Sequence, residues 1–127
     1  MDIFYGPTPV KGQRLNRSKT KNKPRVKLSS GLFTLMMWDP DAPQGTWLHW
    51  LVTNIPGDIA RGTDVVMYAP PTPPPGTGVH RYHFTLFPQT HRISVEHVDR
   101  QDFSIQSFAT RYGLQHPYAQ TLFLQGA

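Results

Sequence analysis

Short apolar runs, separated by prolines and turn residues, give this sequence the pattern of a β-rich protein. Segments rich in β-branched and aromatic residues predict strands at 25–28, 32–38, 47–54, 64–68, 80–87 and 93–97. The segment 80–87 alternates, because Tyr82, Phe84 and Leu86 share one face and the residues between them share the other. The segment HWLVTNI, residues 49–55, is apolar almost throughout, as expected of a strand that is buried on both faces.

One segment, residues 103–112, has apolar residues at helical spacing and favours a helix. Asp102 or Ser104 can cap its start, and Gly113 can end it. A helix this short depends on packing against a sheet. The whole pattern predicts an all-β fold, mainly an antiparallel β-sandwich of two stacked sheets, with a short peripheral helix near residues 103–112.

Length and composition place these elements in a single domain, residues 1–127. The chain has no cysteine, which excludes disulfides and thiol chemistry. No stretch approaches the roughly 20 apolar residues of a membrane-spanning helix. The first residues also lack the pattern of a signal peptide, so we expect a cytoplasmic protein.

The chain has a net charge of +5, and its basic residues are most concentrated in residues 11–27, called the basic segment below. This segment holds all five lysines and three arginines, and no acidic residue. We interpret it as a solvated loop, with attraction to an anionic membrane surface or an acidic protein as alternatives. It lacks the interleaved aromatic residues that stack on bases, which argues against specific nucleic-acid binding. The proline run at 70–75 could be a polyproline ligand, but a stiff loop between two strands is the interpretation we favour.

Polar side chains gather in three places where a loop meets an apolar strand. Asp39 and Asp41 end one strand in the sequence DPDAP, and His49 begins the next. His80 and Arg81 follow the glycines of GTGVHR. A protonated histidine donates two hydrogen bonds, and an aspartate beside one ring nitrogen favours that charged form. If the strand ends cluster, these residues form an anion site, although Asp41 could instead pair with Arg81 and hold two loops together.

Metal binding and catalysis receive less support from these residues. Asp39, His49 and His80 could supply three metal ligands, but no HxH or HExxH spacing accompanies them. Thr77 and two other threonines lie near the motifs, but none stands in a nucleophile-elbow sequence. We therefore predict no metal, no cofactor and no enzymatic activity. We interpret the histidines at positions 83, 91, 97 and 116 as structural.

The motifs occur in an order that resembles the phosphatidylethanolamine-binding proteins, a family that includes the animal Raf kinase inhibitor proteins and the plant flowering regulators. The resemblance rests on DPDAP, LHWLVTNIPG, GTGVHRYHFTLFPQ and FSIQSFATRYGLQHPYAQTLF, and it covers nearly the whole chain. It implies a sandwich-like β fold with a small pocket for phosphate or phosphorylated head groups. Matched residue by residue, it implies these ligand-binding residues: Asp39, Asp41, Pro43, His49, Pro74, His80 and Tyr82. It also implies a cis peptide bond between Ala42 and Pro43.

Three features depart from the family pattern. Only three residues, 44–46, separate Pro43 from the next strand, where relatives carry several more, so an aromatic pocket wall is expected to be missing or rebuilt. Trp47 matches the animal pattern, so plant-type activity does not carry over. No helix follows the strand QTLFLQ, whereas animal relatives have one that gates the pocket, so we expect a more open site.

The resulting hypothesis is a non-enzymatic protein that binds phosphate or phospholipid head groups and modulates signalling proteins. His49 and His80 would donate to the anion, with both rings oriented and charged by Asp39. Tyr82 would add a hydroxyl donor. One alternative is inhibition of a protein kinase or a protease through protein contacts, with the pocket incidental. The other is binding of a membrane surface or nucleic acid through the basic segment.

Overall fold

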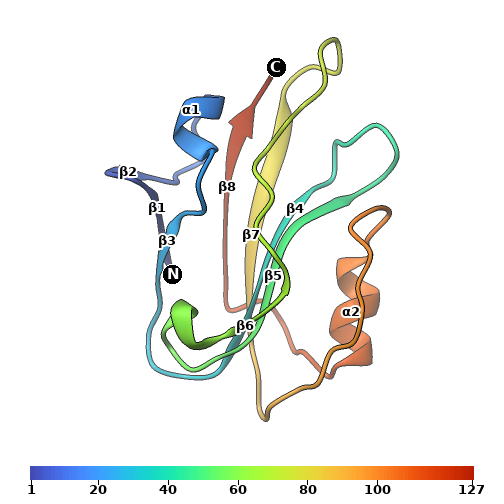
Figure 1. Ribbon diagram of the computed structural model, residues 1–127. Helices are drawn as coiled ribbons and strands as arrows, with labels where there is room; N and C mark the ends of the chain where they lie inside the picture. Colours follow the sequence, from blue (N-terminus) through green and yellow to red (C-terminus); the bar gives the residue numbers. More distant parts are fainter.

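The computed structural model describes residues 1–127 and contains two antiparallel sheets, with a helix against the outer face of the larger one (Figure 1). The small sheet has the order β2-β1-β3, formed by β1 (Asp2–Tyr5), β2 (Thr8–Pro9) and β3 (Arg25–Lys27). The large sheet has the order β6-β5-β4-β7-β8, formed by β4 (Phe33–Asp39), β5 (Trp47–Ile55), β6 (Thr63–Val66), β7 (His80–Pro88) and β8 (Ala119–Gln125). The helical elements are α1 (Arg17–Thr20), the 3-10 turn η1 (Ile59–Arg61) and α2 (Ile105–Arg111).

The main hydrophobic core lies between the two sheets. Leu35 and Met37 of β4 belong to this core, together with Phe123 of β8. Met36, which lies between them in sequence, belongs to a second cluster on the opposite face, where Phe108 of α2 packs. The large sheet is therefore buried on both faces, and its central strands β4 and β5 are continuously apolar for that reason.

The predicted all-β sandwich and its short helix are confirmed. Five predicted strands lie within two residues of β3, β4, β5, β6 and β7. α2 begins after Ser104, whose hydroxyl oxygen accepts a hydrogen bond from the backbone N–H of Ser107 at 3.1 Å. Gly113 follows the helix with a φ of +67°, a conformation that glycine adopts without strain. None of the helices is long and apolar enough to span a membrane.

The strand predicted at residues 93–97 is wrong, because this segment has no regular secondary structure. The side chain of Asn54 takes the place of a neighbouring strand. The backbone N–H of Ile93 donates to Asn54 Oδ1 at 2.9 Å, and the carbonyl of Ile93 accepts from Asn54 Nδ2 at 2.8 Å. Val95 and Val98 pack into the cluster beside α2, so the segment covers the large sheet without pairing to it.

The basic segment is also more ordered than a loop, because it contains both α1 and β3. The N-cap residue of α1 is Asn16, whose side-chain oxygen accepts a hydrogen bond from the backbone N–H of Lys19 at 3.1 Å. The proline run at 70–75 is confirmed as a connection between two strands, since it lies between β6 and β7.

The predicted cis bond before Pro43 is wrong, because the structure contains no cis peptide bond. The backbone N–H of Gly45 donates to the carbonyl of Ala42 at 3.2 Å, which closes a four-residue turn. Pro43 occupies the second position of this turn, where a trans proline is favoured, whereas a cis proline takes the third position. The short connection of residues 44–46 therefore reaches β5 through an ordinary turn.

Candidate functional site

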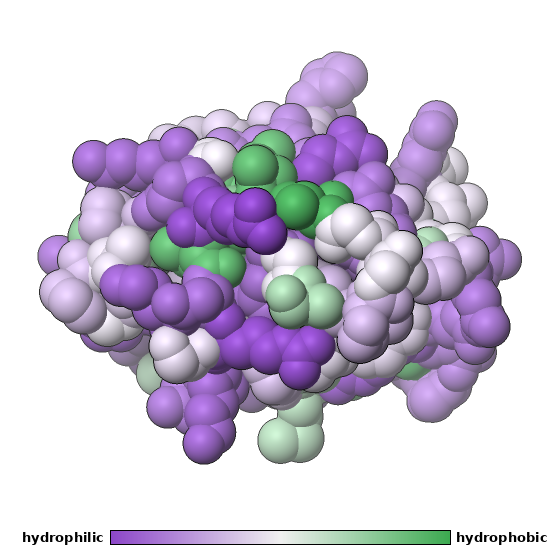
Figure 2. Space-filling view, turned by 90° about the horizontal axis from the view of Figure 1, so that it is seen from above, coloured by the Kyte–Doolittle hydropathy of each residue, from purple (hydrophilic) through white to green (hydrophobic).

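A cavity of about 160 Å³ opens at the end of the sandwich where β4 ends and β7 begins. Its polar lining comes from three strands: Asp39 ends β4, His49 lies in β5, and His80 and Tyr82 lie in β7. The remaining wall is formed by Ala42, Pro43, Trp47, Thr72, Pro73 and Pro74. Figure 2 looks down on this end of the molecule, which is mainly hydrophilic with small apolar areas. A cavity of roughly 150 Å³ holds a benzene-sized molecule, so this one suits a small group.

Asp39 and His80 form a buried pair at the bottom of the cavity. Their side chains are 4% and 1% exposed, and Asp39 Oδ2 lies 2.7 Å from His80 Nδ1. Asp39 Oδ1 accepts from the backbone N–H of Asp41, also at 2.7 Å. A buried carboxylate needs a nearby positive charge, and no lysine or arginine lines the cavity. His80 is the only titratable side chain that bonds to this carboxylate.

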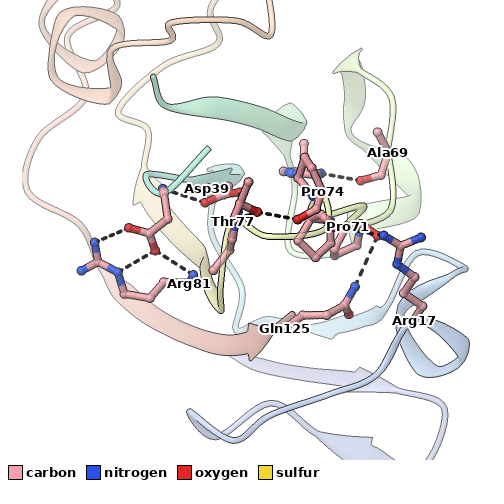
Figure 3. Close-up of polar contacts among 12 residues, drawn as sticks. Arg17, Asp39, Ala69, Pro71, Pro74, Thr77, Arg81 and Gln125 are labelled. Carbon is pink, nitrogen blue, oxygen red and sulfur yellow. Dashed lines mark hydrogen bonds and ion pairs between the residues drawn. The ribbon is translucent and has the colours of Figure 1, made fainter. Parts of the chain in front are cut away.

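Thr77 continues this chain of hydrogen bonds on the other side of His80 (Figure 3). Its hydroxyl oxygen lies 2.8 Å from His80 Nε2 and 2.7 Å from the carbonyl oxygen of Pro74. A carbonyl can only accept, so the single hydroxyl hydrogen goes to Pro74, and the oxygen of Thr77 accepts from His80 Nε2–H. The hydroxyl oxygen of Thr77 therefore faces His80 Nε2, while Asp39 holds Nδ1 on the other side of the ring.

His49 has a different partner. Its Nδ1 lies 2.7 Å from the carbonyl oxygen of Ala69, so Nδ1 carries the hydrogen and donates it. Burial lowers the pKa of His49, which keeps the ring neutral near pH 7. Nε2 of the neutral ring is an acceptor. The expectation that Asp39 orients and charges both histidines is wrong, because its carboxylate bonds to His80 and not to His49.

The hydroxyl of Tyr82, like His49 Nε2, is a polar atom on the buried wall of the cavity that bonds to no other residue. Burial raises the pKa of Tyr82, so the hydroxyl keeps its hydrogen and can donate it. The Tyr82 ring stacks on Phe123, with 5.2 Å between centroids and 18° between planes, which fixes its direction. No fully buried side-chain nitrogen or oxygen lacks a partner, so the free atoms of Tyr82 and His49 reach the cavity that they line.

The proline rim of the cavity is held from two distant parts of the chain. Prolines have no N–H, so this loop can be fixed only through its carbonyls and side chains. Arg17 of α1 donates to the carbonyl of Pro73 at 3.0 Å, and Gln125 of β8 donates to that of Pro71 at 3.3 Å. Figure 3 shows both side chains reaching the loop from the same side.

Asp41 is the one predicted ligand-binding residue that does not line the cavity. Its Oδ1 accepts from Arg81 at 2.8 Å, and its Oδ2 accepts from both the backbone N–H and Nε of Arg81 at 2.9 Å. These hydrogen bonds lower the pKa of Asp41 to about 2. The structure therefore places Asp41 and Arg81 in the second role that the sequence suggested, a brace between two loops.

Two contributors were missed by the sequence analysis. Trp47 lines the cavity and supplies an aromatic wall, with its ring 4.7 Å from that of His49. Arg100 lies behind this wall with its guanidinium 5.2 Å from the Trp47 ring. It donates to the carbonyl of His49 at 2.9 Å and to that of Met67 at 2.6 Å. No sequence motif accompanies Arg100, so only the folded structure reveals its role.

Comparison with known proteins gives consistent matches. The family model "Phosphatidylethanolamine-binding protein" matches residues 7–124. The chain is 39% identical to "Protein BROTHER of FT and TFL 1" of Arabidopsis thaliana, over 88% of this chain and 70% of that protein. It is 38% identical to "Protein TERMINAL FLOWER 1" of Arabidopsis thaliana, over 97% of this chain and 77% of that protein. A carboxypeptidase Y inhibitor, solved with its cognate proteinase, shares the fold, with a TM-score of 0.86 at 21% identity over 99% of this chain and 82% of the inhibitor.

Proposed function

Because this chain belongs to the phosphatidylethanolamine-binding protein family, we propose that it is a non-enzymatic regulatory protein that binds phosphate-type anions in the cavity beside His49 and His80. The observation that carries this proposal is the set of four buried polar side chains around a small opening. Two of their atoms, His49 Nε2 and the Tyr82 hydroxyl, have no partner in the chain. A preformed pocket in which a few polar groups converge between apolar walls is typical of a small-ligand site.

The charge of the cavity also supports an anion. In the charged form that we propose for it, His80 balances the Asp39 carboxylate, and the basic side chain of Arg17 stands at the rim through its bond to Pro73. Arginine at a site entrance raises the local concentration of anions. Phosphate or a phosphorylated head group would accept from Tyr82, and from His80 once Thr77 releases Nε2–H.

Asp39, His80 and Thr77 stand in the order of acid, imidazole and hydroxyl that serine-type hydrolases use. Two features of the hydrogen bonds keep Thr77 from acting as a nucleophile. Its hydroxyl hydrogen goes to Pro74, and the imidazolium of His80 has no lone pair to receive a proton. This arrangement supports a binding role over a hydrolytic one.

A histidine-resolved NMR titration with inorganic phosphate and phosphoethanolamine tests the proposal. We expect the ring signals of His49 and His80 to shift with ligand, and the shifts at His49 to be lost in His80→Ala. His97→Ala is the matched control, because His97 is 84% exposed and bonds only to Asp99. An absence of shifts at millimolar ligand in the wild type would refute the anion site. Regulation through protein contacts with a kinase or protease would then be the interpretation to test.

The basic segment supports a second candidate function, attraction to an anionic membrane surface. It holds eight of the thirteen basic side chains and none of the eight acidic ones, and all eight are exposed. Clusters of this size bind anionic lipid with an energy that salt weakens. Sedimentation with vesicles containing phosphatidylserine, at low and high salt, tests this candidate. Replacing Lys19, Lys21 and Lys23 by glutamine should weaken the salt-sensitive binding by about 1 kcal/mol for each lysine and leave the cavity unchanged.

A further inference from the structure

Two unpartnered polar atoms on the buried wall of the cavity, the Tyr82 hydroxyl and His49 Nε2, require different things from a ligand. The Tyr82 hydroxyl can donate a hydrogen bond, whereas Nε2 of a neutral His49 can only accept one. We infer that the cavity takes a phosphate group that itself carries a hydrogen, as a phosphate monoester or inorganic phosphate does, in preference to the phosphate diester of an intact phospholipid. This inference rests on the proposed function and specifies its ligand class.

The acceptor at His49 Nε2 is fixed by the backbone around it. Ala69 accepts from Nδ1 at 2.7 Å and donates its own N–H to the carbonyl of His49 at 2.9 Å. Arg100 donates to the same carbonyl at 2.9 Å. Turning the imidazole would break the bond to Ala69 and leave a buried carbonyl without that partner. The lone pair of Nε2 therefore faces the cavity in any complex that keeps this backbone arrangement.

The charged groups around His49 decide how easily its ring can gain a proton. Asp39 from β4 favours the charged form, but its carboxylate already bonds to His80. His80 from β7 and Arg100 from the segment between β7 and α2 both disfavour the charged form of His49 and lower its pKa. Tyr82 keeps its hydrogen and adds no charge, and burial of His49 opposes protonation most strongly. If the ligand supplies the hydrogen of this hydrogen bond, His49 stays neutral and no second positive ring is placed beside His80.

A phosphate monoester can supply that proton near neutral pH. Its second pKa is about 6, so part of it carries one P–OH group. The P–OH hydrogen would be donated to His49 Nε2, and the other phosphate oxygens would accept from Tyr82. A diester has no such hydrogen, so it leaves Nε2 unpaired or requires His49 to be protonated. The unpaired atom alone corresponds to a loss of about fivefold or more in affinity.

Isothermal titration calorimetry on the wild-type protein tests the inference with two matched pairs of ligands. Phosphoethanolamine and glycerophosphoethanolamine share a head group and differ as monoester and diester. Phosphate and sulfate share their shape, and sulfate cannot supply the hydrogen in this pH range. At pH 6.5 we expect phosphoethanolamine to bind at least about fivefold more tightly than glycerophosphoethanolamine, and phosphate at least about fivefold more tightly than sulfate. The ester difference should narrow only when the pH falls below the lowered pKa of His49, where the ring itself gains a proton.

A second readout is the number of protons taken up, obtained from the heat of binding in buffers of different ionisation enthalpy. At pH 7.5 phosphate should bind with net proton uptake of more than half a proton, because the dianion is the larger fraction there. Equal affinities within each pair, or binding of phosphate without proton uptake, would overturn the inference and leave the anion site standing. No binding of any of the four ligands would overturn the proposed function as well.

Discussion

Replacing Thr77 by alanine is predicted to tighten phosphate binding. In the structure the Thr77 hydroxyl occupies Nε2–H of His80, which is the strongest donor of the cavity because it belongs to a charged ring. An anion can use this donor only after the hydroxyl leaves it. Alanine removes the hydroxyl and keeps the backbone N–H of residue 77, which donates to Pro74 at 3.2 Å. The turn is also maintained by Gly76, whose φ is +82°.

The expected gain in phosphate affinity follows from the hydrogen bond between Thr77 and His80, which the anion no longer has to break. A hydrogen bond to a charged group contributes about 1.5–3 kcal/mol when it is buried. Thr77 is exposed, and water partly replaces it in the free variant, so about 1 kcal/mol is the more suitable figure. At RT of about 0.59 kcal/mol this corresponds to an affinity gain of roughly fivefold.

Thr77→Ser is the matched control, because serine keeps the hydroxyl and differs from alanine only in that group. Phosphate titrations followed by the His80 ring signals should give wild-type affinity for the serine variant and a lower Kd for the alanine variant. The Nε2–H proton of His80 should also exchange faster with water in the alanine variant. Weaker phosphate binding by Thr77→Ala would show that the hydroxyl is itself a ligand contact, and the reasoning would be wrong.

Three further predictions concern stability and can be checked by urea denaturation. Asp39→Asn leaves the His80 imidazolium without its counter-charge and should lower the free energy of unfolding by about 3–5 kcal/mol; an unchanged midpoint would show that His80 is neutral. Phe123→Ala removes a fully buried ring that contacts Tyr82, so it should cost about 3–5 kcal/mol and also weaken phosphate binding. The Asp41–Arg81 pair should stabilise the protein fully above the unfolded pKa of 3.8, and this contribution should disappear as the pH falls through about 2. The difference in midpoint between wild type and Arg81→Gln should therefore shrink from pH 4 downwards and vanish only below pH 2, and a difference that stays constant from pH 5 to pH 2 would contradict the assignment.

The strands and the composition of the site could be predicted because both depend on local pattern. The alternation of Tyr82, Phe84 and Leu86 fixes which face of β7 enters the core, and the core contains all three. The acids and histidines at strand ends meet because antiparallel strands bring such ends together. By contrast, β1 and β2 are four and two residues long, and strands this short carry too little periodicity to be identified.

The protonation states of the site could not be predicted from sequence. His49 and His80 have similar surroundings in the sequence, since each lies at the start of an apolar strand. They differ in their partners, because one faces the carbonyl of Ala69 and the other faces the carboxylate of Asp39. The path of the loop after β6 decides which backbone carbonyl reaches His49, and Gly, Pro and Thr residues in that loop specify no contact of this kind.

The anchoring of the proline rim has a consequence for the time at which the protein acquires its ligand. Arg17 lies 56 residues before Pro73, and Gln125 lies 54 residues after Pro71, so both contacts join distant parts of the chain. Contacts of this kind form late in folding, because a long loop must close before they contribute. A nascent chain still lacking β8 would already contain Asp39, His49 and His80 but would have no Gln125 to hold the rim. We therefore expect ligand affinity to develop only after residue 125 has left the ribosome and paired with β7.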